Sequence, residues 1–247
     1  MIKRKILTSL FAMGVALATS GTQAIPLSNL FQGGDITVGD KLFDNWALEY
    51  SESDTEIDFS QIEVDPLDAD PMNIGLNYNA NSQLSVFGPD SFLDVSFAFD
   101  VTVLNPDYRV NGSSLEITGT DFDGEGGLIT VLETVSDSGD NEIDVMEASV
   151  DHLFGDEMLM ASLSFGPLAA LSIVTDILLF TDDFEGDSAE LTSFEQHFSQ
   201  TKATDVPEPS TLLLMGLGLA AIGVGRRRKQ GGKVLSSCSC PGGFPMA

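Results

Sequence analysis

Between residues 94 and 103 the chain alternates apolar side chains with small or acidic ones, with a period of two residues. The apolar set consists of Val95, Phe97, Phe99, Val101 and Val103. Successive side chains of a β-strand point to opposite faces, so this pattern predicts a strand with one buried face and one solvated face. An antiparallel sheet that packs on one side against a second layer provides that environment.

Shorter stretches of the same alternation recur along the chain, separated by clusters of Gly, Asn, Asp and Pro. The further predicted strands are 35–38, 46–50, 57–64, 74–78, 83–87, 114–118, 128–135, 158–165, 171–180 and 191–198. About ten short strands at this spacing predict an all-β fold, an antiparallel β-sandwich that is jelly-roll-like.

Two segments predict something other than a simple strand. Residues 105–112 lie between two strand signals and predict a hairpin connection, with Asn111-Gly112 suited to positive φ. In residues 141–154 the apolar side chains fall on one face of a helix, and we expect one short helix there.

The first 24 residues have the features of a secretory signal peptide. Residues 3–5 are Lys-Arg-Lys, residues 6–18 are mainly apolar, and Thr22-Gln23-Ala24 has the small residues that a signal peptidase requires. The apolar run is too short to span a bilayer, and its flanks are those of a cleaved signal. We therefore expect cleavage after Ala24 and export of the mature chain.

A second signal has three parts in a fixed order. Pro207, Glu208 and Pro209 form a stiff segment, because each proline fixes φ and lacks a backbone N–H. Residues 210–225 are 16 uncharged, mostly apolar residues, about 24 Å of helix against about 30 Å of hydrocarbon, a shortfall that arginine snorkelling can cover. The cations Arg226, Arg227 and Arg228 follow, and they predict a transmembrane helix with its cationic end in the cytoplasm and the body outside.

This arrangement resembles the PEP-CTERM sorting domain, which occurs in Gram-negative bacteria that make extracellular polysaccharide. The resemblance rests on Pro207-Glu208-Pro209, with Ser210 and Arg226 to Arg228 in support, and covers about residues 205–229. It implies that an exosortase, a membrane-embedded cysteine transpeptidase, cleaves near the Pro-Glu-Pro segment and releases or attaches the body. The pattern does not account for the Gly- and Ser-rich residues 230–247.

The expected organisation follows from these two signals. It consists of a signal peptide (1–24), an acidic β-sandwich domain (25–200), a linker (201–206), the sorting signal with its transmembrane helix (207–229) and the tail (230–247). Near the start of the domain, Gly39-Asp40-Lys41-Leu42-Phe43 is similar to an opening motif in a subset of PEP-CTERM proteins. That resemblance implies β architecture and export but no chemistry, and we expect its glycines to serve turns.

Between the two signals the chain is strongly acidic. Residues 25–206 hold 37 Asp and Glu against three basic residues (Lys41, Arg109 and Lys202), a net charge of −34. Such a body repels nucleic acid and anionic headgroups, so we expect no nucleic-acid partner. Both cysteines, Cys238 and Cys240, follow the cationic block, so no disulfide stabilises the exported domain.

The sequence contains no recognisable catalytic motif. His152 and His197 are its only histidines, and G-x-S-x-G, H-E-x-x-H and phosphate-binding glycine motifs are all missing. Each histidine fits a surface or strand position better than the role of a base, because a base needs an oriented partner. We therefore predict that the protein is not an enzyme and has no cofactor other than a possible cation.

The best candidate for a cation site is the trio Asp121, Asp123 and Glu125. Carboxylates at alternate positions before a glycine resemble the front half of a calcium loop, where several oxygens converge on one hard cation. Leu132 stands where an EF-hand has its Glu, which excludes an EF-hand. Two hypotheses remain, a weak Ca²⁺ site and a plain acidic hairpin loop.

Two functions from different classes fit this sequence. The first is an exported, non-enzymatic cell-surface or extracellular-matrix protein that is associated with exopolysaccharide in a biofilm. The second is a carbohydrate-binding module, assisted by Ca²⁺ in one version, with a glycosidase as a more distant third. Sugar sites favour exposed aromatic side chains, and Trp46 is the only tryptophan. Burial of Trp46 between the sheets would contradict a sugar platform built on it.

Overall fold

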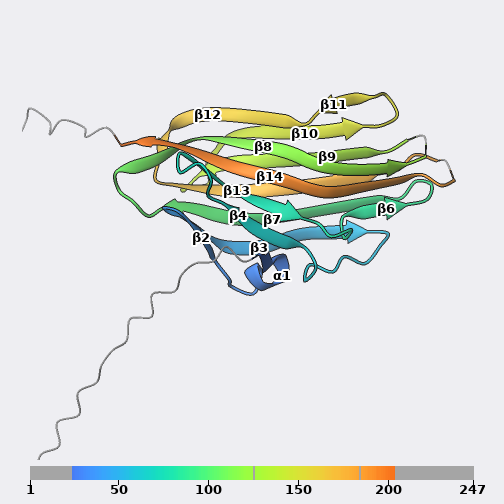
Figure 1. Ribbon diagram of the computed structural model, residues 1–247, viewed down its shortest axis with the longest axis horizontal. Helices are drawn as coiled ribbons and strands as arrows, with labels where there is room; N and C mark the ends of the chain where they lie inside the picture. The colour runs from blue at the N-terminus through green and yellow to red at the C-terminus, as the bar shows by residue number, and fades with distance from the viewer. Residues whose placement is uncertain (1–23, 125, 184, 204–247) are drawn as a thin grey trace, which may run out of the picture. The chain divides into compact units, whose positions relative to one another are not determined.

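The structure, a computed structural model, describes residues 24–124, 126–183 and 185–203 (Figure 1). One short helix and fourteen strands make up this part of the chain. In chain order they are β1 (Ile25–Pro26), α1 (Leu27–Leu30), β2 (Ile36–Val38), β3 (Lys41–Ser53), β4 (Glu63–Leu67), β5 (Asn73–Asn79), β6 (Ser85–Phe87), β7 (Phe92–Val103), β8 (Tyr108–Asp123), β9 (Leu128–Asp137), β10 (Glu142–Asp151), β11 (Asp156–Met158), β12 (Met160–Leu168), β13 (Ala170–Phe180) and β14 (Ser188–Lys202).

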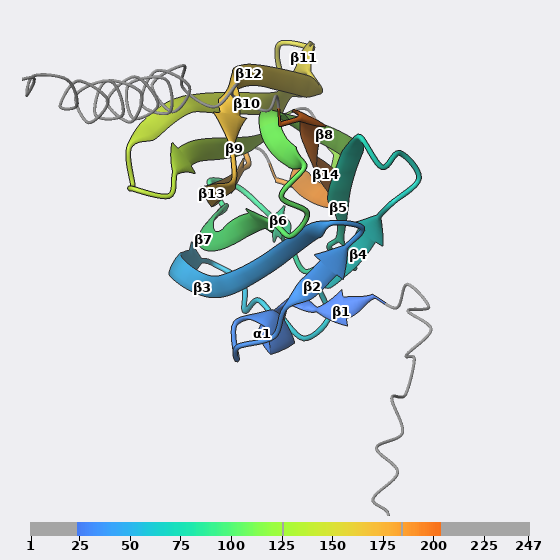
Figure 2. The same ribbon diagram turned by 90° about the vertical axis from the view of Figure 1, so that its left-hand side faces the viewer.

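The strands form two seven-stranded antiparallel sheets that pack face to face (Figure 2). The first sheet has the order β1-β4-β5-β14-β8-β12, and β6 also pairs with β14. The second has the order β11-β10-β9-β13-β7-β3-β2. The chain crosses repeatedly from one sheet to the other, as in jelly-roll sandwiches. The predicted antiparallel β-sandwich is therefore confirmed.

Strand β7 buries the apolar face that its sequence predicted. Four of the five predicted inward side chains are at most 1% exposed, namely Val95, Phe97, Phe99 and Val101, and the fifth, Val103, is partly buried. The strand lies inside its sheet, between β3 and β13. From the opposite sheet, Tyr78 lies 5.7 Å from Phe97 and Phe198 lies 6.3 Å from Phe99, between ring centroids. The aromatic residues of both sheets thus share one core.

The helix expected within residues 141–154 is wrong. Residues 142–151 form strand β10, which pairs with β9 over almost its whole length. The segment also carries a two-residue period, since Met146, Ala148 and Val150 are buried in alternation. Its apolar positions satisfy both periods, and the backbone hydrogen bonds that β9 offers favour the strand.

The hairpin expected at residues 105–112 is also wrong. Residues 104–107 lead from β7 in one sheet to β8 in the other, and these two strands do not pair with each other. Asn111 and Gly112 lie inside β8, and neither has positive φ. Gly112 serves close packing instead, because a Cβ there would lie 2.8 Å from the backbone oxygen of Leu163.

Several sequence features lie outside the described residues. These are the signal peptide up to residue 23 and the whole region from 204 to 247, which contains the expected transmembrane helix. Within the described ranges, no helix is both long enough and apolar enough to cross a bilayer. Strand β14 ends at Lys202, two residues into the segment expected as a linker.

Candidate functional site

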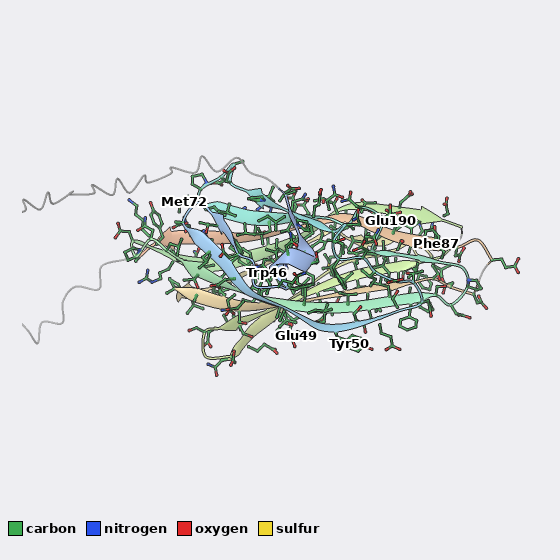
Figure 3. All side chains as sticks on the ribbon, turned by 90° about the horizontal axis from the view of Figure 1, so that it is seen from below. Trp46, Glu49, Tyr50, Met72, Phe87 and Glu190 are labelled. Carbon is green, nitrogen blue, oxygen red and sulfur yellow. The ribbon has the colours of Figure 1, made fainter. Side chains whose placement is uncertain are left out.

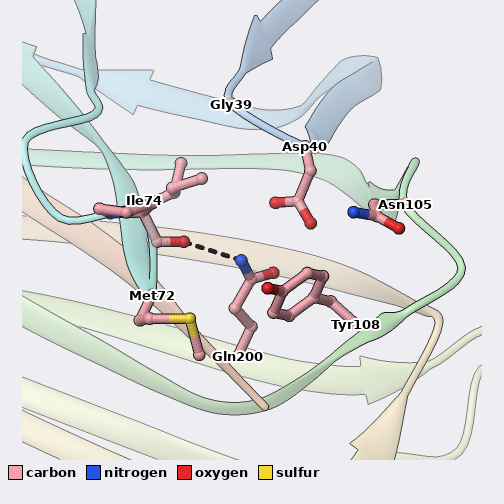
Figure 4. A pocket seen from close by; sticks show the side chains of 8 residues that line it. Gly39, Asp40, Met72, Ile74, Asn105, Tyr108 and Gln200 are labelled. Atoms are coloured by element: carbon pink, nitrogen blue, oxygen red, sulfur yellow. Dashed lines mark hydrogen bonds between the residues drawn. The ribbon is translucent and has the colours of Figure 1, made fainter. Parts of the chain in front are cut away.

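A pocket of about 250 Å³ lies where three turns meet, those between β2 and β3, β4 and β5, and β7 and β8 (Figure 4). Asp40 and Asn105 lie on one side of it and Met72 on the other. The end of β14 contributes Gln200. The full lining is Gly39, Asp40, Pro71, Met72, Ile74, Asn105, Tyr108 and Gln200.

The turn between β2 and β3 positions Asp40. Gly39 has φ of +56°, in the left-handed region that glycine adopts without a steric cost. A Cβ at Gly39 would lie 2.5 Å from Cδ1 of Ile74, so any larger residue would have to displace that buried side chain. The backbone N–H of Leu104 donates to the Asp40 carbonyl at 2.7 Å, which ties this turn to the β7–β8 connection.

Lys41 lies behind the pocket and is fully buried. Its Nζ donates to Oε1 of Gln200 at 2.9 Å and lies 3.5 Å from Oδ1 of Asp40. Burial lowers the pKa of Lys41, and the neighbouring Asp40 carboxylate opposes that shift. Nε2 of Gln200 donates to the Pro71 carbonyl at 2.7 Å, drawn as the dashed line in Figure 4. These contacts fix the side chain of Gln200 in the pocket wall.

No motif in the sequence predicts this pocket. A signal for Lys41 was nevertheless present, because the alternation that turns Phe43 inward also turns Lys41 inward. The other lining residues come from turns that are far apart in the sequence, so no local pattern joins them.

The pocket combines an apolar wall with a few polar groups. Met72, Ile74 and the ring of Tyr108 supply the apolar part. Oδ2 of Asp40 is buried and has no hydrogen-bond partner among the described residues, and Asn105 adds an amide. Because Lys41 balances the Asp40 carboxylate, the site suits a neutral molecule with hydroxyl groups better than an ion. Its volume is below the roughly 300–1,000 Å³ of drug-sized sites and fits a single small ring.

A second polar cluster joins the two sheets inside the core. Ser113 Oγ donates to Oε1 of Glu133 at 2.5 Å, and Gln196 Nε2 donates to Oε2 of Glu133 at 2.8 Å. Gln196 Nε2 also donates to Oγ1 of Thr175 at 2.8 Å. Burial raises the pKa of Glu133 to about 7, although the hydrogen bonds from Ser113 and Gln196 oppose this shift. All four side chains are buried, so the cluster stabilises the sandwich and does not face a ligand.

The structure describes two of the three residues of the predicted cation site, Asp121 and Asp123, and they lie two positions apart on one strand. Asp121 and Asp123 belong to β8 and are exposed, with Glu190 and Ser188 opposite them on β14. Glu125 lies outside the described residues. In the part of the chain that the structure describes, no group of three or more His, Cys, Asp or Glu side chains is placed to hold a metal ion.

Trp46 is not available to a ligand. Its side chain is 5% exposed and stacks on Phe99 with 4.4 Å between ring centroids, while Nε1 donates to the Phe43 carbonyl at 3.2 Å. Figure 3 shows Trp46 among the strands, whereas Glu49 and Tyr50 lie at the outer margin of β3. This burial contradicts a sugar platform built on Trp46.

The two histidines have local partners. Nε2 of His197 lies 2.9 Å from Oε2 of Glu195, two residues away on the same strand. The ring of His152 stacks on Phe122 with 4.9 Å between centroids. Neither histidine lines the pocket around Asp40.

These features define a β-sandwich protein with a small, partly polar pocket where three of its turns meet. The chain also carries a PEP-CTERM protein-sorting motif at residues 205–229. This confirms the resemblance drawn from Pro207, Glu208 and Pro209 and from Arg226 to Arg228, although all of these residues lie outside the described part. No curated protein matches the sequence.

Among solved structures, the chain is similar to TmCBM61 in complex with beta-1,4-galactotriose, at 15% identity and a TM-score of 0.25. The aligned region covers 64% of this chain and 89% of the TmCBM61 chain. The chain is also similar to the mannan-recognising carbohydrate-binding module TmCBM27, at 14% identity and a TM-score of 0.29, covering 65% and 90%. A third similarity, to tailspike protein 4 of bacteriophage CBA120, has 10% identity and a TM-score of 0.23. It covers 61% of this chain but only 19% of the tailspike chain. At these values the similarities say nothing about a ligand.

Proposed function

We propose that the chain is an exported, non-enzymatic cell-surface or extracellular-matrix protein that associates with exopolysaccharide. The observation that carries this proposal is the sorting motif at residues 205–229. In this proposal a signal peptidase removes residues 1–24, the inner membrane holds the precursor, and an exosortase cleaves near Pro207-Glu208-Pro209. The mature body then acts at the surface of a Gram-negative cell or outside it.

The body has properties that suit this role. Its stability comes from an apolar core without disulfides, so it does not depend on an oxidising compartment for folding. Its net charge of −34 keeps it soluble and attracts divalent cations, which link acidic polymers.

Intact mass spectrometry of the extracellular protein from its native host tests the processing step. We expect the mass of a polypeptide that begins at Ile25 and ends near Pro207 to Pro209. A full-length, membrane-bound species as the sole product would refute it. A deletion strain tests the role in the matrix, and unchanged biofilm, adhesion and matrix composition would count against that role.

The pocket around Asp40 supports a second candidate function, the binding of a single sugar residue. A sugar ring has an apolar C–H face and a rim of hydroxyl groups. Tyr108 and Met72 suit the face, while Asp40 and Asn105 suit the rim. This version of the carbohydrate-binding hypothesis does not involve Trp46.

A glycan array with two matched variants tests this candidate. Tyr108→Ala removes the ring in the pocket, whereas Tyr50→Ala removes an exposed ring elsewhere, on β3. We expect Tyr108→Ala alone to abolish any glycan signal. Equal loss in both variants, or no signal with the native protein, would exclude the pocket as a sugar site.

In the calcium-assisted version of this candidate function, Asp121, Asp123 and Glu125 hold a weak Ca²⁺ site. Asp121 of β8 lies directly opposite Glu190 of the neighbouring strand β14, and like charges in that arrangement destabilise a sheet unless a cation screens them.

A further inference from the structure

Strand β12 is a sheet edge without charged residues, and a bulge with Pro167 interrupts it only near its end, between Ser164 and Leu168. It is the last strand of its sheet, and only β8 pairs with it in the described part of the chain. Sheet edges in native proteins are usually short or carry charged residues, because unpaired backbone groups bind other strands. Strand β12 is nine residues long and uncharged, and the whole run from Met158 to Thr175 lacks a charged residue.

The hydrogen-bond register shows which backbone groups of β12 are free to pair. Met160 lies opposite Glu116, and the N–H of Ile117 donates to the Leu159 carbonyl at 2.8 Å. In an antiparallel ladder this arrangement makes Met160–Glu116 a non-hydrogen-bonded pair. The N–H and C=O groups of Met160, Ser162 and Ser164 therefore point away from β8, toward the open edge.

A second open edge in the same protein provides a contrast. Strand β2 pairs with β3 only at residues 41–43, so residues 45–53 of β3 have no strand on that side in the described part of the chain. This stretch carries Glu49 and Glu52, both exposed. Acidic side chains protect that edge against pairing between two acidic molecules. Strand β12 lacks this protection.

Exposed apolar side chains gather beside the same edge. Of the thirteen large hydrophobic residues that are exposed in the described part of the chain, five lie between residues 153 and 160, namely Leu153, Phe154, Met158, Leu159 and Met160. Figure 2 shows that β10, β11 and β12 lie together at one margin of the sandwich. Near the other end of β12, an apolar groove of about 340 Å³ is lined by Phe165, Gly166, Pro167 and Leu168, with Ile143 and Asp137.

We propose that the β12 edge pairs with the β12 edge of a second copy of this chain, in antiparallel orientation about a two-fold axis near Ser162. The distribution of charge favours a second copy of the chain as the partner at this edge. Two bodies of net charge −34 repel each other over most surfaces, whereas the central part of this edge, residues 159–165, is uncharged and pairs with the same residues of the second copy. The two-fold axis makes the contact self-complementary, so the assembly closes as a dimer.

The register of this pairing also places apolar groups together. With Ser162 opposite Ser162 of the second copy, Leu159 lies opposite Phe165 of that copy, at the border of its apolar groove. The two-fold axis creates this pair twice, so the exposed Leu159 of each copy lies beside an apolar residue of the other copy. Backbone hydrogen bonds supply the remaining contacts, as in other cases of strand addition.

Sedimentation velocity of the protein purified from its host tests the pairing, with variants at Ser162. Ser162→Pro removes an outward-pointing N–H but no hydrogen bond to β8, and proline is tolerated at such edge positions. Ser162→Glu places two carboxylates together at the axis. Ser162→Ala keeps the backbone donor and is the matched control.

We expect the native protein and Ser162→Ala to sediment as dimers. The Pro and Glu variants should raise the dissociation constant by about tenfold or more, with unchanged circular dichroism. If Ser162→Pro fails to fold, the Glu variant alone decides. A native protein that is monomeric at 100 micromolar (a concentration of about 10⁻⁴ M, where even weak specific pairs associate) would overturn the proposal. So would a native dimer that both variants leave intact.

Discussion

Gln196 of β14 and Glu133 of β9 join the two sheets through a 2.8 Å hydrogen bond in the middle of the core. The donor is Nε2 of Gln196 and the acceptor is Oε2 of Glu133. Ser113 donates to the other carboxyl oxygen. Two neutral donors do not compensate fully for the loss of water around a carboxylate, which explains why burial raises the pKa of Glu133 to about 7.

The first prediction concerns stability and pH. The pKa of Glu133 is about 7 in the folded protein, above the ordinary value of 4.5 for a glutamate side chain. The folded state therefore holds this proton more tightly, and the stabilisation is complete below about pH 4.5 and is lost as the pH rises through 7. The loss is on the order of 3 kcal/mol.

Urea unfolding of the native protein and of Glu133→Gln between pH 4.5 and pH 8 measures this effect. Both proteins carry the same surface charges, so the difference between their unfolding free energies isolates Glu133. We expect Glu133→Gln to lack this component of the pH dependence. Parallel profiles for the two proteins would contradict the prediction.

The second prediction concerns Trp46. Its ring stacks on Phe99 in the core, so Trp46→Ala leaves a cavity and should lower the free energy of unfolding by about 3–5 kcal/mol. Tyr50→Ala, on the exposed part of the same strand, should change it by about 0.5 kcal/mol or less. Circular dichroism in urea measures both. A Trp46 variant as stable as the native protein would show that the ring is not part of the core.

The third prediction concerns the turn that positions Asp40. Gly39→Ala forces an alanine into the left-handed region and against Ile74, and should destabilise the protein by about 1–3 kcal/mol. Gly166→Ala is the control, because nothing lies within 4 Å of a Cβ there and its φ is not positive. Equal stabilities for the two variants in urea would be inconsistent with a special conformation at Gly39.

The fourth prediction concerns calcium binding, which calorimetric titration measures. If the site exists, millimolar Ca²⁺ should give a heat of binding that the double variant Asp121→Asn, Asp123→Asn loses. Asp65→Asn with Asp68→Asn, a second pair of acidic residues in and after β4, provides a control of equal charge change. A native protein that gives no heat would end the hypothesis.

The sequence predicted the two-layer β-sandwich better than it predicted how the strands are connected. Strand β7 extends over residues 92–103 and contains the predicted segment 94–103, because the sandwich enforces the two-residue period directly. The sequence of residues 142–151 fits a helical and a strand period equally, and the hydrogen bonds from β9 and β11 favour the strand. The connection at residues 104–107 joins two sheets, and local turn residues do not encode which sheet the next strand enters.

The pocket could not be predicted for a related reason. Asp40 and Gln200 are 160 positions apart in the chain, and only the finished sandwich brings the β2–β3 turn beside the end of β14. The motif Gly39-Asp40-Lys41-Leu42-Phe43 is visible in the sequence, but the role of each residue depends on the three-dimensional fold. Gly39 makes the turn, Asp40 lines the pocket, Lys41 supports Gln200, and Phe43 enters the core.

The burial of Lys41 determines how the exported body reacts with covalent reagents. Lys41 and Lys202 are the only lysines between the two signals, and the body has no cysteine. Lys41 is fully buried, whereas Lys202 is exposed at the end of β14. An amine-reactive dye or cross-linker therefore meets one lysine side chain on the folded body, three residues before the sorting motif begins. Besides the α-amino group that cleavage after Ala24 would create, Lys202 is the one amine of the body open to such labelling.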